Sequence, residues 1–158
     1  MKFGLTEYRN SLADFVKQIS IFKNLSDRYL DLIVDGFSPV NFRKGEIIFN
    51  QGALDRDFYV IRHGQVEISF MDVFHEKKVI AILKNGEFFG EMSLLEGTTR
   101  TAAAQAVEPS RLLVIRKNDF QRLLASDPKL ALYLLQTVVE RLRRANEEIE
   151  GLLFRNIL

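Results

Sequence analysis

The spacing of apolar residues changes twice along this chain, and this change restricts the possible folds more than any single motif does. Residues 1–38 follow a helical period, residues 39–116 a strand-like period, and residues 117–158 a helical period again. At 158 residues the chain is long enough for one domain with its own core. The pattern predicts an α+β fold in which N-terminal helices and a long C-terminal helix flank a central β unit.

Short apolar runs fill the middle of the chain. They occupy residues 47–49, 58–61, 66–70, 79–83 and 112–115. Turn signals that contain glycine lie between them, at Gly45, Gly52, Gly64 and Gly86. Several short strands at close spacing are typical of a barrel, roll or sandwich. We expect an antiparallel β-roll of the jelly-roll or double-stranded β-helix type.

The C-terminal third contains two helix-start signals. Asn118 and Gln121 have the spacing of a capping box. Asp127 followed by Pro128 is typical of an N-cap with proline at the first helical position. These signals predict a short hinge helix and then a long helix from Pro128 to about Leu152.

Apolar residues of the long helix recur at alternating spacings of three and four, as in the a/d seam of a coiled coil. The seam consists of Leu135, Val138, Leu142, Ala145, Ile149 and Leu152. The seam could pack on the β-roll, but a helix of this length extends past a small domain. We therefore expect a helix–helix partner, most simply a second copy of the chain in a homodimer.

Composition excludes several classes of function. The net charge is +1, which gives no overall electrostatic case for nucleic acid or an anionic membrane. The chain has no cysteine, so disulfides and thiolate nucleophiles are excluded. His63 and His75 do not have metal-ligand spacing, and no nucleophile–base pair stands out. We expect no enzyme and no metal, and, because no signal peptide or membrane span is evident, a cytoplasmic protein.

The most informative residues lie in the segment 88–103. Gly90 can let the backbone turn where a side chain would obstruct it, and Glu91 to Leu95 can form one helical turn. Arg100 would then start the next strand and could fold back over the same hollow. A guanidinium binds two oxygens of an anion, and a carboxylate accepts from a hydroxyl. Glu91 and Arg100 suit a cyclic phosphodiester with a free ribose hydroxyl, and they could also pair with each other.

This segment strongly resembles the phosphate-binding cassette of cyclic nucleotide-binding domains. The shared features are a Gly-Glu pair, a small residue, two leucines and an Arg-x-Ala motif, here Gly90, Glu91, Ser93, Leu94, Leu95, Arg100 and Ala102. Eight residues separate Glu91 from Arg100, as in protein kinase A regulatory subunits. The likeness runs from about Leu25 to Leu152 and includes the dimerisation helix of the catabolite activator (Crp/Fnr-like) family. Residues 89–103 are called the cassette below.

The resemblance implies a role for each matching residue. Gly90 and Glu91 would hold the ribose 2′-hydroxyl. Arg100 would hold the cyclic phosphate, with further contacts from Met92, Ser93 and Thr101. Three positions on the long helix would approach the base: Arg141, Ala145 and Asn146.

The base preference is open at this point. Ala145 replaces the hydroxyl residue of the best-known catabolite activator, whereas Asn146 could still meet an adenine amino group. Thr101 places a hydroxyl beside the phosphate, as in relatives that accept guanine. The resemblance implies cAMP as the regulatory ligand, with cGMP as the alternative.

Two functions fit these residues. In the first, the chain is a cyclic-nucleotide sensor that signals through its C-terminal helix to a protein. In the second, it is the sensor half of a Crp/Fnr-like transcription regulator, whose helix-turn-helix is absent from this sequence. Because the chain lacks a recognition helix, we expect no specific DNA binding by this chain alone. A relative that senses another ligand is disfavoured by the intact Glu91 and Arg100.

Overall fold

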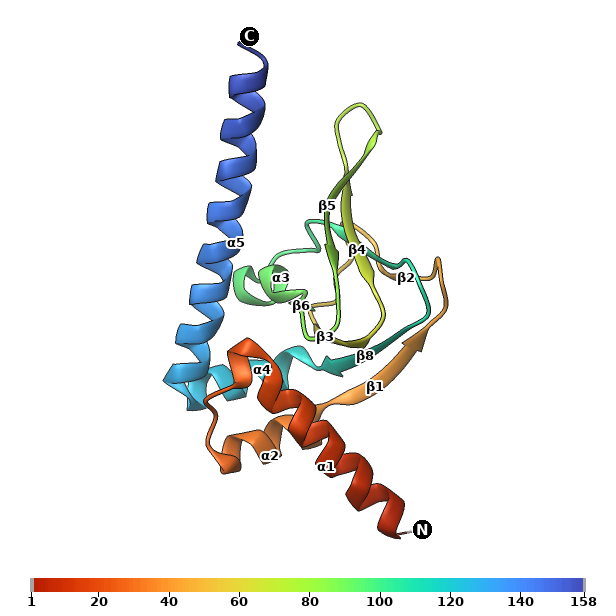
Figure 1. Cartoon of the computed structure of the whole chain (residues 1–158), viewed down its shortest axis with the longest axis vertical. Helices are drawn as coiled ribbons and strands as arrows, with labels where there is room; N and C mark the ends of the chain where they lie inside the picture. The colour runs from red at the N-terminus through yellow and green to blue at the C-terminus, as the bar shows by residue number, and fades with distance from the viewer. Residues whose placement is uncertain (1, 158) are drawn as a thin grey trace.

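The computed structural model describes residues 2–157. The helices are α1 (Lys2–Gln18), the 3-10 helix η1 (Ser20–Phe22), α2 (Asp27–Gly36), α3 (Glu91–Glu96), α4 (Lys117–Ser126) and α5 (Pro128–Arg155). The strands are β1 (Ser38–Phe42), β2 (Ile47–Phe49), β3 (Phe58–His63), β4 (Val66–Met71), β5 (Lys77–Leu83), β6 (Phe88–Phe89), β7 (Ala103–Ala106) and β8 (Ser110–Ile115). This confirms the α+β class, with a β-roll between N-terminal helices and a long C-terminal helix (Figure 1).

Two four-stranded antiparallel sheets form the roll. Their strand orders are β1-β8-β3-β6 and β2-β7-β4-β5. Strands β1 and β6 were not among the predicted runs, and β7 begins at Ala103, three residues after the strand start expected at Arg100. The sequence of β7, Ala-Ala-Gln-Ala, has little strand propensity. Pairing with β2 and β4 on its two sides makes it a strand.

Strand β3 separates two hydrophobic cores, and all of its apolar residues are buried. Phe58 and Val60 pack with the helices, whereas Tyr59 and Ile61 lie in the interior of the roll. Because side chains alternate across a strand, β3 contributes to both cores at once. The loop before β3 therefore leads into a strand that contacts both the interior of the roll and the helices.

Helix α5 begins as predicted. Asp127 is its N-cap and accepts a hydrogen bond from the Lys129 N–H at 3.0 Å, with Pro128 in the first turn. The helix continues to Arg155, which is three residues beyond the predicted end.

Helix α4 begins differently from the prediction. Its N-cap is Arg116, so the capping box expected of Asn118 and Gln121 is wrong. The Lys117 N–H at the start of the helix donates instead to Asp57 Oδ1 at 3.0 Å. This acceptor comes from the loop before β3, 60 residues away in sequence, so no local motif could reveal it.

The two halves of α5 have different surroundings. Leu130 and Leu134 are buried against the helical core. Leu135, Leu142, Ile149 and Leu152 of the predicted seam are each more than half exposed. Apart from Val138, which is half-buried against the core, the seam therefore does not pack on the roll, and Figure 1 shows the C-terminal part of α5 extending past it. Within residues 2–157 no helix is apolar over a stretch that could cross a bilayer.

Candidate functional site

The cassette forms a tight turn, one short helix and a loop. Gly90 precedes α3 with a φ of 89°, and Gly97 ends α3 with a φ of 71°. A Cβ atom on Gly90 would lie 2.8 Å from both Arg100 Nη1 and the Asp57 carbonyl oxygen. Both the left-handed conformation and the close approach therefore require glycine at position 90.

Arg100 is the most enclosed charged group of the site, with a relative exposure of 3%. Its Nη1 donates to the Gly90 carbonyl at 3.0 Å and to Ser93 Oγ at 2.9 Å. Its Nη2 donates to Asp55 Oδ2 at 2.6 Å and to the Asp57 carbonyl at 2.8 Å. The backbone of Arg100 is held as well, through hydrogen bonds with Gly52 and Ala53.

The planar guanidinium of Arg100 also lies over an aromatic ring. Its Cζ is 4.0 Å from the centroid of Phe49. Phe49 belongs to a cluster with Tyr59 and Phe89, and the last two rings stack at 5.1 Å. Burial raises the pKa of Tyr59 to about 12, and the carboxylate of Asp55 adds to the effect. One side of the site is therefore formed by the buried rings of Phe49, Tyr59 and Phe89, with the guanidinium of Arg100 lying over Phe49.

Arg100 retains one unused donor. Its Nε is buried and has no hydrogen-bond partner in the described part of the chain. Buried polar groups are paired in the great majority of cases, and an unpaired donor on a buried charge is costly. This N–H is therefore available to an acceptor from outside the chain.

Glu91 is also buried, at a relative exposure of 5%, but its partner is not Arg100. Its Oε1 accepts from Arg141 Nη1 at 2.7 Å. The possible Glu91–Arg100 pair is thus corrected, because each charge has its own counterion: Arg141 for Glu91 and Asp55 for Arg100. Each charge is therefore held by its own ion pair, and Glu91 and Arg100 do not neutralise each other.

Arg141 connects the cassette with α5. Its guanidinium donates to the Phe88 carbonyl and lies over the Phe88 ring, 4.4 Å from the centroid. In this structure it therefore positions Glu91. The predicted approach of Arg141 to a base remains a prediction.

The other predicted site residues lie at different distances from this centre. Ser93 is buried and accepts from Arg100. Met92 and Thr101 are exposed, and the Thr101 hydroxyl lies 4.0 Å from the Met92 sulfur. Ala145 and Asn146 are exposed on α5 and have no hydrogen bond to the cassette. The structure thus brings Gly90, Glu91, Ser93, Arg100 and Arg141 together and leaves Ala145 and Asn146 outside.

Sequence reasoning missed Asp55, Asp57, Phe49 and Tyr59 as parts of the site. The available signal was two aspartates flanking one arginine directly before a strand. No group of His, Asp and Glu side chains suited to a metal ion occurs in the part of the chain described here. His63 and His75 are both exposed.

A family model described as the cyclic nucleotide-binding domain matches residues 39–127. The chain is 33% identical over 139 residues to the Cyclic AMP receptor protein of Thermus thermophilus, covering 88% of this chain and 64% of that protein. It is 31% identical over 156 residues to a cGMP-dependent protein kinase of Drosophila melanogaster, covering 96% of this chain and 16% of the kinase. The chain therefore spans less than two thirds of the length of either relative.

A solved structure resembles nearly the whole chain. It is the sensor domain of the transcriptional regulator DNR from Pseudomonas aeruginosa, with a TM-score of 0.78 and 28% identity. The similarity covers 91% of this chain and 97% of that domain.

Proposed function

The chain belongs to the cyclic nucleotide-binding domain family, and from this premise we propose that it is a sensor of cAMP that passes on ligand binding through α5. The buried guanidinium of Arg100, with its unpaired Nε–H, is the observation that carries this proposal. A phosphodiester is an acceptor with two free oxygens and one negative charge, and it suits a planar donor better than a water molecule does.

Binding of the phosphate would rearrange the partners of Arg100. Asp55 now occupies Nη2 of Arg100, and the Asp55 side chain is 40% exposed. This carboxylate can leave for solvent, whereas the carbonyls of Gly90 and Asp57 belong to fixed backbone. Asp55 and the cyclic phosphate each carry one negative charge. Exchange of one for the other therefore keeps the buried Arg100 paired with an anion. Ser93 and, at the rim, Met92 and Thr101 complete the proposed phosphate side.

The ribose side of the proposed site is Glu91 with Gly90. Arg141 binds Oε1 of Glu91, and no hydrogen bond occupies Oε2 within the described residues. A carboxylate oxygen held in this way can accept from the ribose 2′-hydroxyl. Arg141 holds the carboxylate in place through this ion pair, so it serves the site as a positioning residue.

The base side determines the choice between cAMP and cGMP. We assign Arg141, Ala145 and Asn146 to it as a proposal, with the last two completed by rearrangement of α5 or by a second subunit. Ala145 carries no hydroxyl, so polar contacts to the base from this face depend on Arg141 and Asn146. We favour cAMP, because the Cyclic AMP receptor protein is a relative over most of this chain. The relation to a cGMP-dependent protein kinase keeps cGMP as the alternative.

The exposed seam of α5 is the proposed output surface. Its apolar residues would pack against those of a second copy in a parallel or antiparallel helix pair. Several of them are more than half exposed, and each gains by burial in a partner. We propose a homodimer, a cytoplasmic location and no catalytic activity of the chain itself.

A calorimetric titration of the full chain with cAMP and with cGMP tests the function. Wild type should bind one of them with saturation, and Arg100→Lys should bind at least about tenfold more weakly, because lysine lacks the planar fork. Arg43→Lys, at an exposed arginine outside the site, is the matched control and should bind as wild type does. Glu91→Gln keeps the shape of the carboxylate, and it provides a second test if Arg100→Lys fails to fold. Equal affinity in all four proteins would contradict the site.

A second candidate function is the sensor half of a Crp/Fnr-like transcription regulator. The observation in its favour is the similarity over nearly the whole chain to the sensor domain of a transcriptional regulator. Both candidates use the same nucleotide site and differ only in the partner that receives the signal from α5, a separate protein or a DNA-binding module. Sequence-specific DNA binding by the natural full-length product, dependent on the nucleotide, would favour the second candidate.

A further inference from the structure

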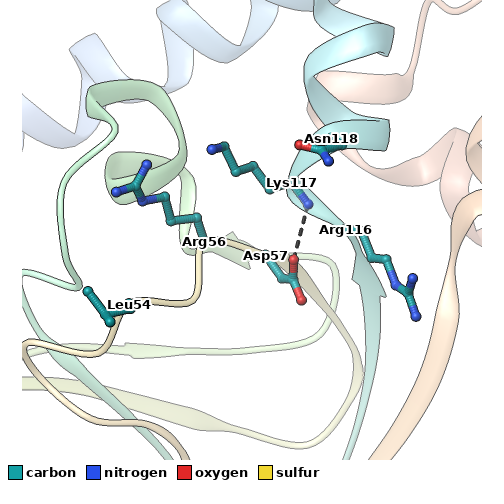
Figure 2. A pocket seen from close by; sticks show the side chains of 6 residues that line it. All are labelled: Leu54, Arg56, Asp57, Arg116, Lys117 and Asn118. Atoms are coloured by element: carbon teal, nitrogen blue, oxygen red, sulfur yellow. Dashed lines mark hydrogen bonds between the residues drawn. The ribbon is translucent and has the colours of Figure 1, made fainter.

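An open, cation-lined pocket, called the cavity below, lies outside the cassette. It has a volume of about 350 Å³ and is lined by Leu54, Arg56, Asp57, Arg116, Lys117 and Asn118. The loop before β3 supplies the first three residues, and the start of α4 supplies the other three (Figure 2). No residue of the proposed nucleotide site except the backbone neighbour Asp57 contributes to it.

The charges of this cavity are not balanced. Three cationic residues and one carboxylate line the pocket, and that carboxylate already accepts from the Lys117 N–H. None of the three cations forms an ion pair in residues 2–157, and the half-buried Arg56 has a buried Nε without a partner. Figure 2 shows the side chains of Arg56 and Lys117 extending into the same space, while Arg116 points away. The space itself therefore holds two cations, Arg56 and Lys117, against one carboxylate, and neither cation is ion-paired among the described residues.

The geometry suits a compact oxyanion. A guanidinium presents parallel donors and a lysine presents a point charge, which together match a phosphate group. The several oxygens of a phosphate can accept from both cations at once, from the guanidinium in parallel and from the ammonium singly. We propose that the cavity binds a dianionic phosphate, either free or as a small phosphate monoester.

Such a ligand would connect two elements that carry the proposed signal. A Cβ atom on Gly97 would be 3.7 Å from Arg56 Nη1, so this guanidinium lies beside the end of α3 in the cassette. Lys117 is the first residue of α4. Asp57 lies between them, because its carbonyl accepts from Arg100 and its carboxylate from α4. An anion held by Arg56 and Lys117 would therefore fix the cassette relative to α4.

Amide NMR spectra of the full chain, titrated separately with inorganic phosphate and phenyl phosphate, test this site. The titrations run at constant ionic strength and at a pH of about 8, above the second pKa of a phosphate monoester. We expect saturable shifts at Arg56, Lys117 and Asn118. Tighter binding of one probe tells whether the free ion or the ester is the preferred source.

Variants distinguish this cavity from the nucleotide site. Arg56→Gln with Lys117→Gln should weaken phosphate binding by about tenfold or more, because two charged donors are lost. Lys84→Gln removes a charge from the turn between β5 and β6 and should leave binding unchanged. The shifts at Arg56, Lys117 and Asn118, rather than those in the cassette, report this binding, so the result is independent of the nucleotide proposal.

Three results would overturn the assignment. The first is equal binding by the double variant and wild type. The second is a set of shifts confined to Glu91, Met92 and Ser93, because the anion would then occupy the cassette. The third is tighter binding of a hexa-aspartate peptide than of either phosphate probe, which would make the cavity a docking point for an acidic segment.

Discussion

The cassette and the C-terminal half of α5 differ in how far their side chains find partners within the chain. In the cassette, a 3% exposed arginine is held by two carbonyls, a hydroxyl and a carboxylate before any ligand arrives. In α5, beyond Arg141, apolar side chains are presented to solvent on a regular helix with nothing from the roll upon them. The proposed recognition site is thus held together within one chain, whereas the proposed output surface consists of apolar side chains that the chain leaves exposed.

Arg141 is the residue at which the two regions meet. It lies on α5, yet its guanidinium contacts Glu91 and the carbonyl and ring of Phe88. A ligand that changes the environment of Glu91 therefore acts on α5 through one ion pair. Four predictions test the contrast between the two regions, from the largest expected effect to the smallest.

The seam of α5 can be disrupted without touching the roll. Leu142→Glu with Ile149→Glu should raise the dimer dissociation constant by a factor on the order of a thousand, because four apolar side chains leave the interface of a dimer. Sedimentation velocity measures this change. Leu132→Glu, at a leucine of similar exposure outside the seam, is the control. A wild-type chain that stays monomeric at high concentration would show that the seam has another partner.

Gly90 tests how tightly the cassette is built. Gly90→Ala adds a Cβ at a φ of 89° and 2.8 Å from a backbone oxygen. We expect a loss of about 1–3 kcal/mol in the free energy of unfolding, measured in urea, and weaker nucleotide binding. Gly36→Ala, where nothing lies within 4 Å, is the control and should be neutral or slightly stabilising. Equal stability of the two variants would refute the close packing of Arg100 against the turn.

Arg141→Gln removes the connection between the two regions. It leaves the carboxylate of Glu91 buried without a cation, although the Arg141 side chain is itself 33% exposed, so solvent reduces the loss. We expect stability to fall by roughly 1–2 kcal/mol and nucleotide affinity to fall about tenfold. Arg144→Gln, which breaks an exposed pair with Glu140 one turn farther along, should change neither quantity measurably. Weaker dimerisation in Arg141→Gln, without weaker binding, would mean that Arg141 does not position Glu91.

The difference between local and long-range contacts explains how much of the fold could be predicted from the sequence. Periodicity revealed the roll, and Asp127–Pro128 located the start of α5, because both signals are local. The bounds and pairing of β7 and the cap of α4 could not be predicted, because each depends on a partner distant in sequence: β2 and β4 for the strand, Asp57 for the cap.

The candidate site divides in the same way. The motif indicated Glu91 and Arg100 because their types and spacing carry the resemblance. It could not indicate their counterions, since Asp55 and Arg141 are 45 and 50 residues away in the chain. Two opposite charges on one short segment suggested a mutual pair. The fold instead supplies a separate partner to each of them.

The pKa of Tyr59 measures how well the aromatic cluster of Phe49, Tyr59 and Phe89 is shielded from water. Burial, with the nearby carboxylate of Asp55, raises its pKa from the ordinary value near 10 to about 12. A phenol whose pKa is raised by folding stabilises the native state below pH 10, and that contribution is lost as pH rises toward 12. Tyr59→Phe keeps the ring stacked on Phe89 but cannot ionise. Urea unfolding from pH 8 to pH 11 should therefore show a steeper loss of stability in wild type than in Tyr59→Phe. Parallel pH profiles would mean that water reaches Tyr59. The aromatic cluster beside Arg100 would then be open to solvent, and the contrast with the exposed end of α5 would be lost.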